Sequence, residues 1–469
     1  PGGAQVAITT STAPIIYSKG GSILRQLEAW IGPDHFKAGL RRYLTEFAYG
    51  NAASHDLWES LSAASGMPVA ELMRSWVTQP GFPVITAQRN NNTLSLRQRR
   101  FTYLPNDAAQ TWLVPVSITA YTASGRADTQ TILLKKKQTD VILQPDTTAY
   151  HVNPGQTGFY HTCYNDAENL TRLGAMVARQ QLPCMDRWGL QNDLFALVKT
   201  GLVPMATFLD MAENFRSEQA YLPLSSLDSH LFEAVLVLRG KIRTRTTQAA
   251  VTLMNAALDA IGGLPDPDES QTTAMLRDQL FVHGALIGNA QVLNFLTDRF
   301  DEFLNGSTIA PDIFRGVMTA GAVSGGRTAL EAMIRRFEVS GVEHERMTLA
   351  GALGCFDPWP LLEEALDYTL DKLPDRIRFM PLVAAAGNPA AADRLWPWFV
   401  GNFPRIERMH PLLFERVVAA FVPGPGLQDP DRTCTFCERL QHEQPRLKDV
   451  IALSLERLEV NADFRRREK

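Results

Sequence analysis

Apolar residues recur with helical spacing through the first 81 residues of the chain. Residues 23–31 place their apolar side chains on one face of a helix, and Gly32 marks its end. Residues 1–14 lack this periodicity and are predicted to form a loop or an extended lead-in. The same helical spacing predicts three further helices, which begin at the capping or first-turn residues Asp34, Ser54 and Pro68.

The period changes at Phe82. From there to Tyr164, short β-branched runs alternate with turn residues, which is typical of strands joined by tight connections. The predicted strands are residues 84–86, 93–96, 113–121, 129–134, 141–143 and 159–160. This pattern predicts a small antiparallel β-sandwich.

From residue 165 to the end, amphipathic helices of ordinary length follow one another with short Gly, Pro or Asn breaks. Roughly fifteen or sixteen helices fit this span without any sheet. Clear examples are residues 202–215, 231–239, 249–261, 276–287, 292–304, 361–370 and 450–458. Consecutive short helix pairs are the units of HEAT- or armadillo-like superhelices. The fold class is therefore α+β multidomain and mostly α.

The bulk composition narrows the class of protein. Hydrophobic residues make up 45% and charged residues 20%, which is ordinary for a soluble globular chain. A net charge of −4 does not favour a nucleic-acid or anionic-membrane partner, and we find no apolar run of the ~18 residues that a membrane span needs. Five cysteines do not suggest a disulfide framework, so a reducing compartment is permitted and the cytoplasm is favoured, although the compartment stays open.

Tyr17 is the first candidate for chemistry. Gly20 and Gly21 give its turn backbone freedom, and Ser22 is expected to cap the helix that follows. A phenol can donate one hydrogen bond to a developing oxyanion. On residue chemistry alone, however, a buried tyrosine whose hydroxyl bonds a nearby carbonyl is the more common arrangement.

The segment Tyr17-x-Lys19-Gly20-Gly21-x-Ile23-Leu24 resembles the segment of the M1 family of zinc aminopeptidases that carries their transition-state tyrosine. The rest of the chain, about two thirds, resembles the helical C-terminal domain of the puromycin-sensitive and ERAP-like members. Further matches follow in the family's order, over about the first third of the chain: residues 47–52 (FAYGNA), 56–58 (DLW), 76–83 (WVTQPGFP), 112–115 (WLVP) and 152–160 (VNPGQTGFY).

The family's zinc motif is absent from this sequence. An M1 enzyme binds zinc through His-Glu-x-x-His and a later Glu, all N-terminal to the tyrosine segment. Here His344-Glu345 is followed by Thr348, and His442-Glu443 by Arg446, where the second His should stand. Only sixteen residues precede Tyr17, and Pro1 stands where an initiator Met would, so we expect the true N-terminus to lie upstream.

The resemblance therefore implies the C-terminal part of an M1 aminopeptidase, cut inside its catalytic domain. Residues 1–81 would be the helical lobe of an incomplete thermolysin-like catalytic domain. Residues 82–164 would be the β-sandwich, and residues 165–469 the superhelical C-terminal domain.

The resemblance also implies a division of roles. In the parent enzyme, which removes N-terminal residues from peptides, Tyr17 would stabilise the oxyanion, while Lys19, Gly20 and Gly21 would shape its loop. Zinc belongs to the parent enzyme, so this chain alone is expected to bind none and to be inactive. Its partners would be the peptide substrate and the zinc-bearing N-terminal half. Two alternatives stay open: a non-catalytic protein whose helices bind a peptide or another partner, and one half of a split aminopeptidase.

Other candidate groups favour structural explanations. Cys434, Cys437 and His442 supply only three local zinc ligands, and His161 with Cys163 only two, so packing is the preferred interpretation of both sets. The basic clusters 97–100 and 135–137 are interpreted as solvated strand faces and a charged edge.

Overall fold

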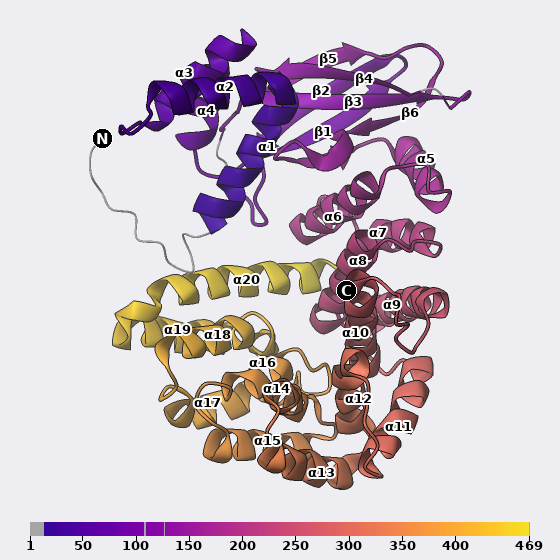
Figure 1. Cartoon of the computed structure of the whole chain (residues 1–469). Coiled ribbons are helices and arrows are strands. Elements are labelled where there is room, and N and C mark those ends of the chain that lie inside the picture. The colour runs from indigo at the N-terminus through magenta and orange to yellow at the C-terminus, as the bar shows by residue number, and fades with distance from the viewer. Residues whose placement is uncertain (1–13, 107–108, 126, 469) are drawn as a thin grey trace. The chain divides into compact units, whose positions relative to one another are not determined.

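The structure, a computed structural model, describes residues 14–106, 109–125 and 127–468. The predicted lead-in, apart from Pro14, lies outside the described residues. The chain divides into two compact units, residues 1–200 and residues 201–469 (Figure 1). The three predicted domains, residues 1–81, 82–164 and 165–469, stay predictions.

The four helices predicted in the lobe are present, and an unexpected turn precedes them. A π-helical turn, η1 (Pro14–Lys19), runs directly into α1 (Gly20–Ile31), and α2 (Pro33–Glu46), α3 (Ser54–Ser65) and α4 (Val69–Val77) follow. Two predicted caps are wrong. The hydroxyl of Ser22 donates back to the Ser18 carbonyl at 2.8 Å because the chain is already helical there. Helix α2 begins at Pro33, one residue before Asp34, because proline suits a first helical position.

Two sheets follow the lobe. One has the strand order β5-β2-β1-β7 and the other β4-β3-β6. The strands are β1 (Pro83–Asn90), β2 (Thr93–Arg100), β3 (Val114–Thr122), β4 (Ala127–Leu134), β5 (Gln138–Ile142), β6 (Thr147–Val152) and β7 (His161–Tyr164).

The structure corrects two details of the predicted sheets. The pairs are antiparallel except β1 with β7, which is parallel, because β7 comes from β6 of the other sheet through a connecting loop and enters the edge in the direction of β1. Phe159 and Tyr160 were predicted to be a strand, but β7 begins at His161. The Phe159 amide is bonded to a side chain of α1 instead of a neighbouring strand.

The lobe helices and both sheets share one hydrophobic core. It contains Leu27 of α1, Leu61 of α3, Trp76 of α4, Leu96 of β2 and Val116 of β3, each fully buried. Helices α5 (Ala167–Ala178) and α6 (Cys184–Thr200) complete this unit by contacting β6 and β7. The lobe is therefore anchored to the sheets by a common interior.

Residues 201–468 form helices joined by turns and loops, without a strand, so the prediction of a mostly helical chain with a small β region is confirmed. From residue 165 onward the described residues form sixteen α-helices, α5 to α20, within the expected number. Those of the second unit are α7 (Met205–Ala212), α8 (Tyr221–Val237), α9 (Gly240–Ile261), α10 (Gln271–Leu286), α11 (Ala290–Leu304), α12 (Pro311–Ser324), α13 (Gly326–Val339), α14 (Glu343–Ala352), α15 (Trp359–Lys372), α16 (Phe379–Ala386), α17 (Leu395–Ile406), α18 (Pro411–Phe421), α19 (Pro430–Glu443) and α20 (Lys448–Arg467), with single 3-10 turns η3 (Glu213–Phe215), η4 (Leu353–Cys355), η5 (Pro425–Gln428) and η6 (Pro445–Leu447).

The even-numbered helices of this unit contact one another in sequence. Each helix from α8 to α18 touches the next even-numbered helix, and α20 returns to contact α8 (Figure 1). The odd-numbered helices α9 to α19 connect them along the chain. The first and last parts of the unit therefore meet.

Gly354 tests the closeness of this packing. A Cβ atom at Gly354 would lie 2.2 Å from the Pro381 carbonyl oxygen and 2.7 Å from the Ala385 nitrogen, both on α16. We expect Gly354→Ala to lower the free energy of unfolding by about 1–3 kcal/mol, because backbone atoms cannot move aside as a side chain can. Chemical denaturation of the chain measures the change.

Gly351 provides the matched control, because a Cβ atom there would meet nothing within 4 Å. Gly351→Ala, inside α14, should be neutral or stabilising by up to about 1 kcal/mol. Equal stabilities for the two variants would contradict the packing that we describe at η4.

Candidate functional site

Tyr17 lies in η1, directly before α1. Its side chain is 64% exposed, and those of Ile15 and Ile16 are 62% and 41% exposed. The interpretation of Tyr17 as a buried packing residue is therefore wrong. Single π-helical turns occur often at functional sites, where they redirect a side chain out of the helical repeat. The phenol is presented on a turn at the surface of the described residues.

Lys19 connects this turn to the segment after α4. Its ammonium donates to the carbonyl oxygens of Gln79 and Gly81, each at 3.2 Å. Burial lowers the pKa of Lys19. The Gln79 side chain in turn donates to the carbonyls of Ser75 at 3.0 Å and Thr111 at 3.1 Å. Lys19 thus joins the Tyr17 turn to a segment that is itself bonded to α4 and to the approach to β3.

Gly20 and Gly21 show no equivalent constraint. A Cβ atom at either position would meet nothing within 4 Å, and neither residue has the positive φ angle that favours glycine. Their predicted role in shaping the loop therefore stays a prediction.

Gln26 and Arg25 connect α1 to the loop between β6 and β7. The Gln26 side-chain oxygen accepts from the Phe159 amide at 2.9 Å, and Arg25 donates to the Gly155 carbonyl at 3.2 Å. Gln26 is buried, and sequence analysis did not select it. The clue was a polar residue on the apolar face of its helix, beside Leu27.

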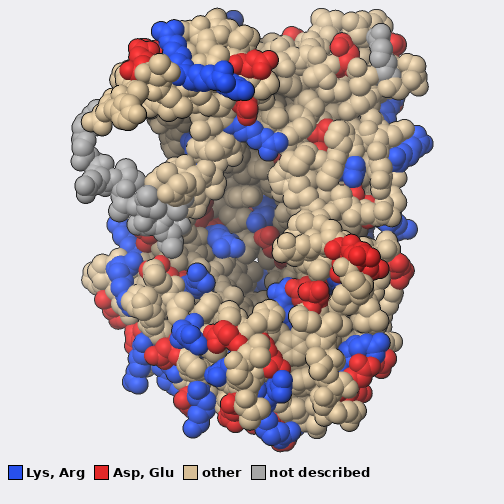
Figure 2. All heavy atoms as spheres, in the orientation of Figure 1, with Lys and Arg blue, Asp and Glu red and all other residues tan. Residues whose placement is uncertain are grey.

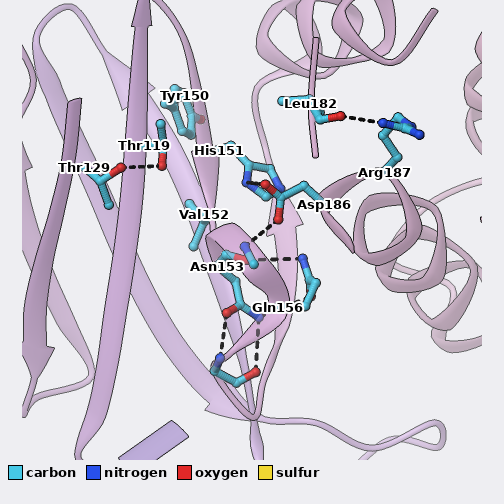
Figure 3. A network of polar contacts seen from close by, with 12 residues as sticks. Thr119, Thr129, Tyr150, His151, Val152, Asn153, Gln156, Leu182, Asp186 and Arg187 are labelled. Atoms are coloured by element: carbon cyan, nitrogen blue, oxygen red, sulfur yellow. Dashed lines mark hydrogen bonds and ion pairs between the residues drawn. The ribbon is translucent and has the colours of Figure 1, made fainter. Parts of the chain in front are cut away.

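The loop that receives these bonds is itself held from inside (Figure 3). Asn153, with a φ of +67°, accepts from the Gly158 amide at 2.7 Å and donates to its carbonyl at 3.1 Å. Asp186 of α6 accepts from the Gly155 amide at 2.5 Å. Burial lowers the pKa of His151 to about 4 and raises that of Asp186, whose carboxylate lies 3.9 Å away. His151 is therefore a neutral packing group near pH 7.

An aromatic cluster lies beneath these polar contacts. The ring of Trp76 lies 6.0 Å from Trp112 and 6.0 Å from Phe159, and Phe82 lies 4.9 Å from Phe159. The Trp76 indole donates to the Leu113 carbonyl at 3.0 Å. We call Trp76, Phe82, Trp112 and Phe159 the aromatic joint. The structure thus brings together the motif segments at residues 76–83, 112–115 and 152–160.

The two remaining motif segments, residues 56–58 and 47–52, differ from each other in burial. Leu57 and Trp58 pack against the same core, whereas residues 47–52 form a surface turn in which Tyr49 is fully exposed.

The remaining candidate residues are packed or hydrogen-bonded within the fold. His161 contacts Asp193 at 2.7 Å and packs against Phe101 at 4.5 Å. Burial raises the pKa of the Cys163 thiol, and that of Cys437 to about 12. Among the described residues, no three or more His, Cys, Asp or Glu side chains are grouped so that they could hold a metal ion.

The visible surface carries mixed charge. Basic and acidic side chains are interspersed over the lower half of Figure 2, where the second unit lies. No single helix in the described ranges is long and apolar enough to cross a membrane. The pair α10 and α11 passes that test together, by length and composition only, and is bent by 102°.

Comparisons with known proteins give two family matches. The family described as ERAP1-like C-terminal domain matches residues 149–459, and the peptidase family M1 domain matches residues 5–76.

Named relatives agree with these matches. The chain is 27% identical to a "Probable aminopeptidase 2" of Sulfurisphaera tokodaii, over 88% of this chain and 50% of that protein. It is 28% identical to the alanine/arginine aminopeptidase of Saccharomyces cerevisiae, over 85% and 47%. It is 32% identical to the puromycin-sensitive aminopeptidase of Caenorhabditis elegans, over 76% and 39%. The chain spans about half the length of the first of these relatives.

Lys19→Met tests the connection that holds the Tyr17 turn. The substitution keeps the aliphatic stem and removes both hydrogen bonds to Gln79 and Gly81. We expect a loss of about 0.5 kcal/mol, at the low end for a hydrogen bond because the side chain is half exposed. We also expect faster amide hydrogen exchange in residues 16–24. Lys37→Met, at an exposed position of α2, should change neither quantity; equal exchange in the two variants would show that Lys19 does not hold the turn.

Proposed function

The chain belongs to the M1 family of zinc aminopeptidases, and from that membership we propose that it is the C-terminal portion of an enzyme that removes N-terminal residues from peptides. The observation that carries this proposal is the surface presentation of Tyr17 on a turn that Lys19 fastens to the segment after α4. A catalytic donor needs both features, because it must reach the substrate and be held in place before the reaction begins.

The chemistry that we assign to this chain is one hydrogen bond. When water attacks a peptide carbonyl, negative charge develops on the carbonyl oxygen. A preorganised donor 2.7–3.1 Å from that oxygen lowers the barrier. Tyr17 would be that donor, and Lys19 would position its turn. Gly20 and Gly21 would leave the turn free to adopt its path.

Zinc and water activation fall outside this chain in our proposal. The M1 family is zinc-dependent, but the described residues do not fit a zinc site, since no suitable group of ligands is present among them. The proposed partner is a zinc-bearing segment, either in the same polypeptide or in a second one as in a split enzyme. The exposed side chains of Ile15, Ile16 and Leu24 support such a partner as its contact surface.

The rest of the chain would shape the cleft. We propose that the two sheets form the β-sandwich spacer and that residues 165–469 form a HEAT-like superhelix that restricts the cleft to unfolded peptides. The ordered contacts among even-numbered helices support the superhelix. The five cysteines, an odd number that does not suggest a disulfide framework, support a reducing compartment such as the cytoplasm.

Tyr17→Phe tests the catalytic role in the enzyme assembled with its zinc-bearing segment. The change keeps the ring and removes the oxyanion donor. Turnover should fall by about 10²–10³, or roughly 3–4 kcal/mol of barrier, while zinc content and peptide binding stay near normal. Tyr49→Phe is the control, because Tyr49 is a fully exposed tyrosine of the same lobe. Unchanged turnover in Tyr17→Phe would mean that Tyr17 has no catalytic role.

The chain alone provides a second test. We expect it neither to bind catalytic zinc nor to cleave peptides, because lowering the pKa of water to ~7 takes a metal held by three ligands with one open position. Metal analysis and an aminoacyl-fluorophore assay with added zinc measure both properties. The positive control is the enzyme assembled with its zinc-bearing segment. Stoichiometric zinc together with chelator-sensitive, saturable hydrolysis would contradict the proposal.

A further inference from the structure

Three arginines gather where the end of the helical unit meets its beginning. Arg239 is the N-cap of α9, two residues after the end of α8, Arg243 lies in the first turn of α9, and Arg465 lies near the end of α20. The charges of Arg239 and Arg243 both act on Arg465, which bonds the end of α8. The carboxylate of Asp393 approaches Arg239, with Oδ1 3.8 Å from Nη2, and the Asp393 side chain is 86% exposed. This pairing is therefore long and well solvated, so it contributes little. The cluster holds more positive charge than its nearby carboxylate can balance.

Two of the three guanidinium groups donate hydrogen bonds to backbone carbonyls. Arg465 donates through Nε to the Val237 carbonyl at 2.7 Å and through Nη1 to the Leu427 carbonyl at 2.9 Å. Arg239 donates through Nη1 to the carbonyls of Leu236 at 3.1 Å and Leu238 at 3.0 Å. These bonds satisfy the carbonyls at the C-terminus of α8, where the helix dipole favours a cation. Arg465 therefore connects the end of α8 to α20 and to η5, and Arg239 bonds the same end of α8.

Arg243 has no such partner. Its side chain is half buried, yet no hydrogen bond or ion pair joins it to any other described residue. Burial lowers the pKa of Arg243, and the charge of Arg239 lowers it further. The pKa of Arg465 falls to about 10 for the same reasons, burial first and then the charges of its two neighbours. A guanidinium presents five N–H donors, and among the described residues no acceptor takes those of Arg243.

We propose that Arg243, together with Arg239 and Arg465, forms a binding site for a small oxyanion, a phosphate or a carboxylate. Planar guanidinium groups match the oxygens of both anions and bind them in two-bonded geometry. The first turn of α9 adds to the attraction. This helix has 22 residues, and Arg239 at its N-cap makes no side-chain capping bond.

The site would act on the helical unit rather than on the reaction. An anion held by Arg243 and Arg465 connects α9 to α20, and Arg239 extends the contact to the end of α8. Binding therefore stabilises the contact between the first and last parts of the unit. The site does not involve Tyr17, so the result of its test is independent of the proposed function.

The test is a titration of the full chain with sodium phosphate and, separately, with sodium succinate, each at constant ionic strength against sodium chloride. Isothermal titration calorimetry gives the affinity, and thermal unfolding gives the stabilisation. At least one of the two anions should bind saturably and raise the melting temperature, and the comparison shows whether phosphate or carboxylate is preferred. Absence of saturable binding by both anions would overturn the proposal.

Three variants separate a built site from general charge attraction. Arg243→Ala should weaken binding about tenfold or more, and Arg243→Lys should recover part of it as a point charge. Arg245→Ala is the matched control, because it removes the same charge from an exposed position on the same helix. Equal losses in Arg243→Ala and Arg245→Ala would overturn the site.

Asp393→Asn keeps the test decisive if the arginine variants fail to fold. Asp393 is exposed, so we expect its substitution to leave the fold intact, and it removes the carboxylate that approaches Arg239. Anion affinity should then rise severalfold. Unchanged or weaker binding in Asp393→Asn would contradict the proposal, whatever the arginine variants show.

Discussion

The burial of Trp76 in the aromatic joint is the constraint on which residues 14–200 depend. Its indole ring is fully buried between Trp112 and Phe159, and its only N–H is bonded to the Leu113 carbonyl. Burying so large a side chain contributes several times the free energy of a single surface contact. The indole N–H allows one orientation of the ring, because turning it would leave a buried donor unpaired. Packing and hydrogen bonding together therefore fix α4 against the start of β3 and the loop before β7.

The polar contacts around the joint transmit that position to Tyr17. Lys19 bonds the carbonyls of the segment between Trp76 and Phe82, and Gln26 bonds the amide of Phe159. Both contacts therefore end on residues of the joint or beside them. A half-exposed ammonium bonded to carbonyls holds a turn only weakly by itself. It becomes a useful constraint because the carbonyls belong to a segment that the buried rings already hold in place.

The sequence predicted the elements better than their connections. Apolar periodicity located the lobe helices because their apolar faces meet the shared core, as Leu27 and Leu61 do. It did not predict the π-helical turn at Tyr17 or the start of α2 at Pro33, since both depend on how the chain enters a helix. The sequence pattern also did not predict the parallel pairing of β7 with β1, because the direction of a strand depends on which sheet edge is open to it. At the candidate site, the resemblance selected Tyr17 and Lys19. Gln26 was missed because only the fold shows that a polar residue on an apolar face meets the Phe159 amide.

The motif segments of this chain are explained mainly by architecture. Residues 76–83, 112–115 and 152–160 supply the rings and backbone groups of the joint, and none of them presents a group suited to attack a peptide bond. The segment around Tyr17 instead presents an exposed phenol on a turn that Lys19 holds. The motifs thus concern the position of the tyrosine. They do not concern the activation of the attacking water. Under the proposed function, the joint would position the tyrosine, and the zinc-bearing segment would supply the residues that activate water. This separation is physically reasonable because the joint is stabilised by packing within residues 14–200, whereas water activation requires metal ligands that the described residues do not bring together.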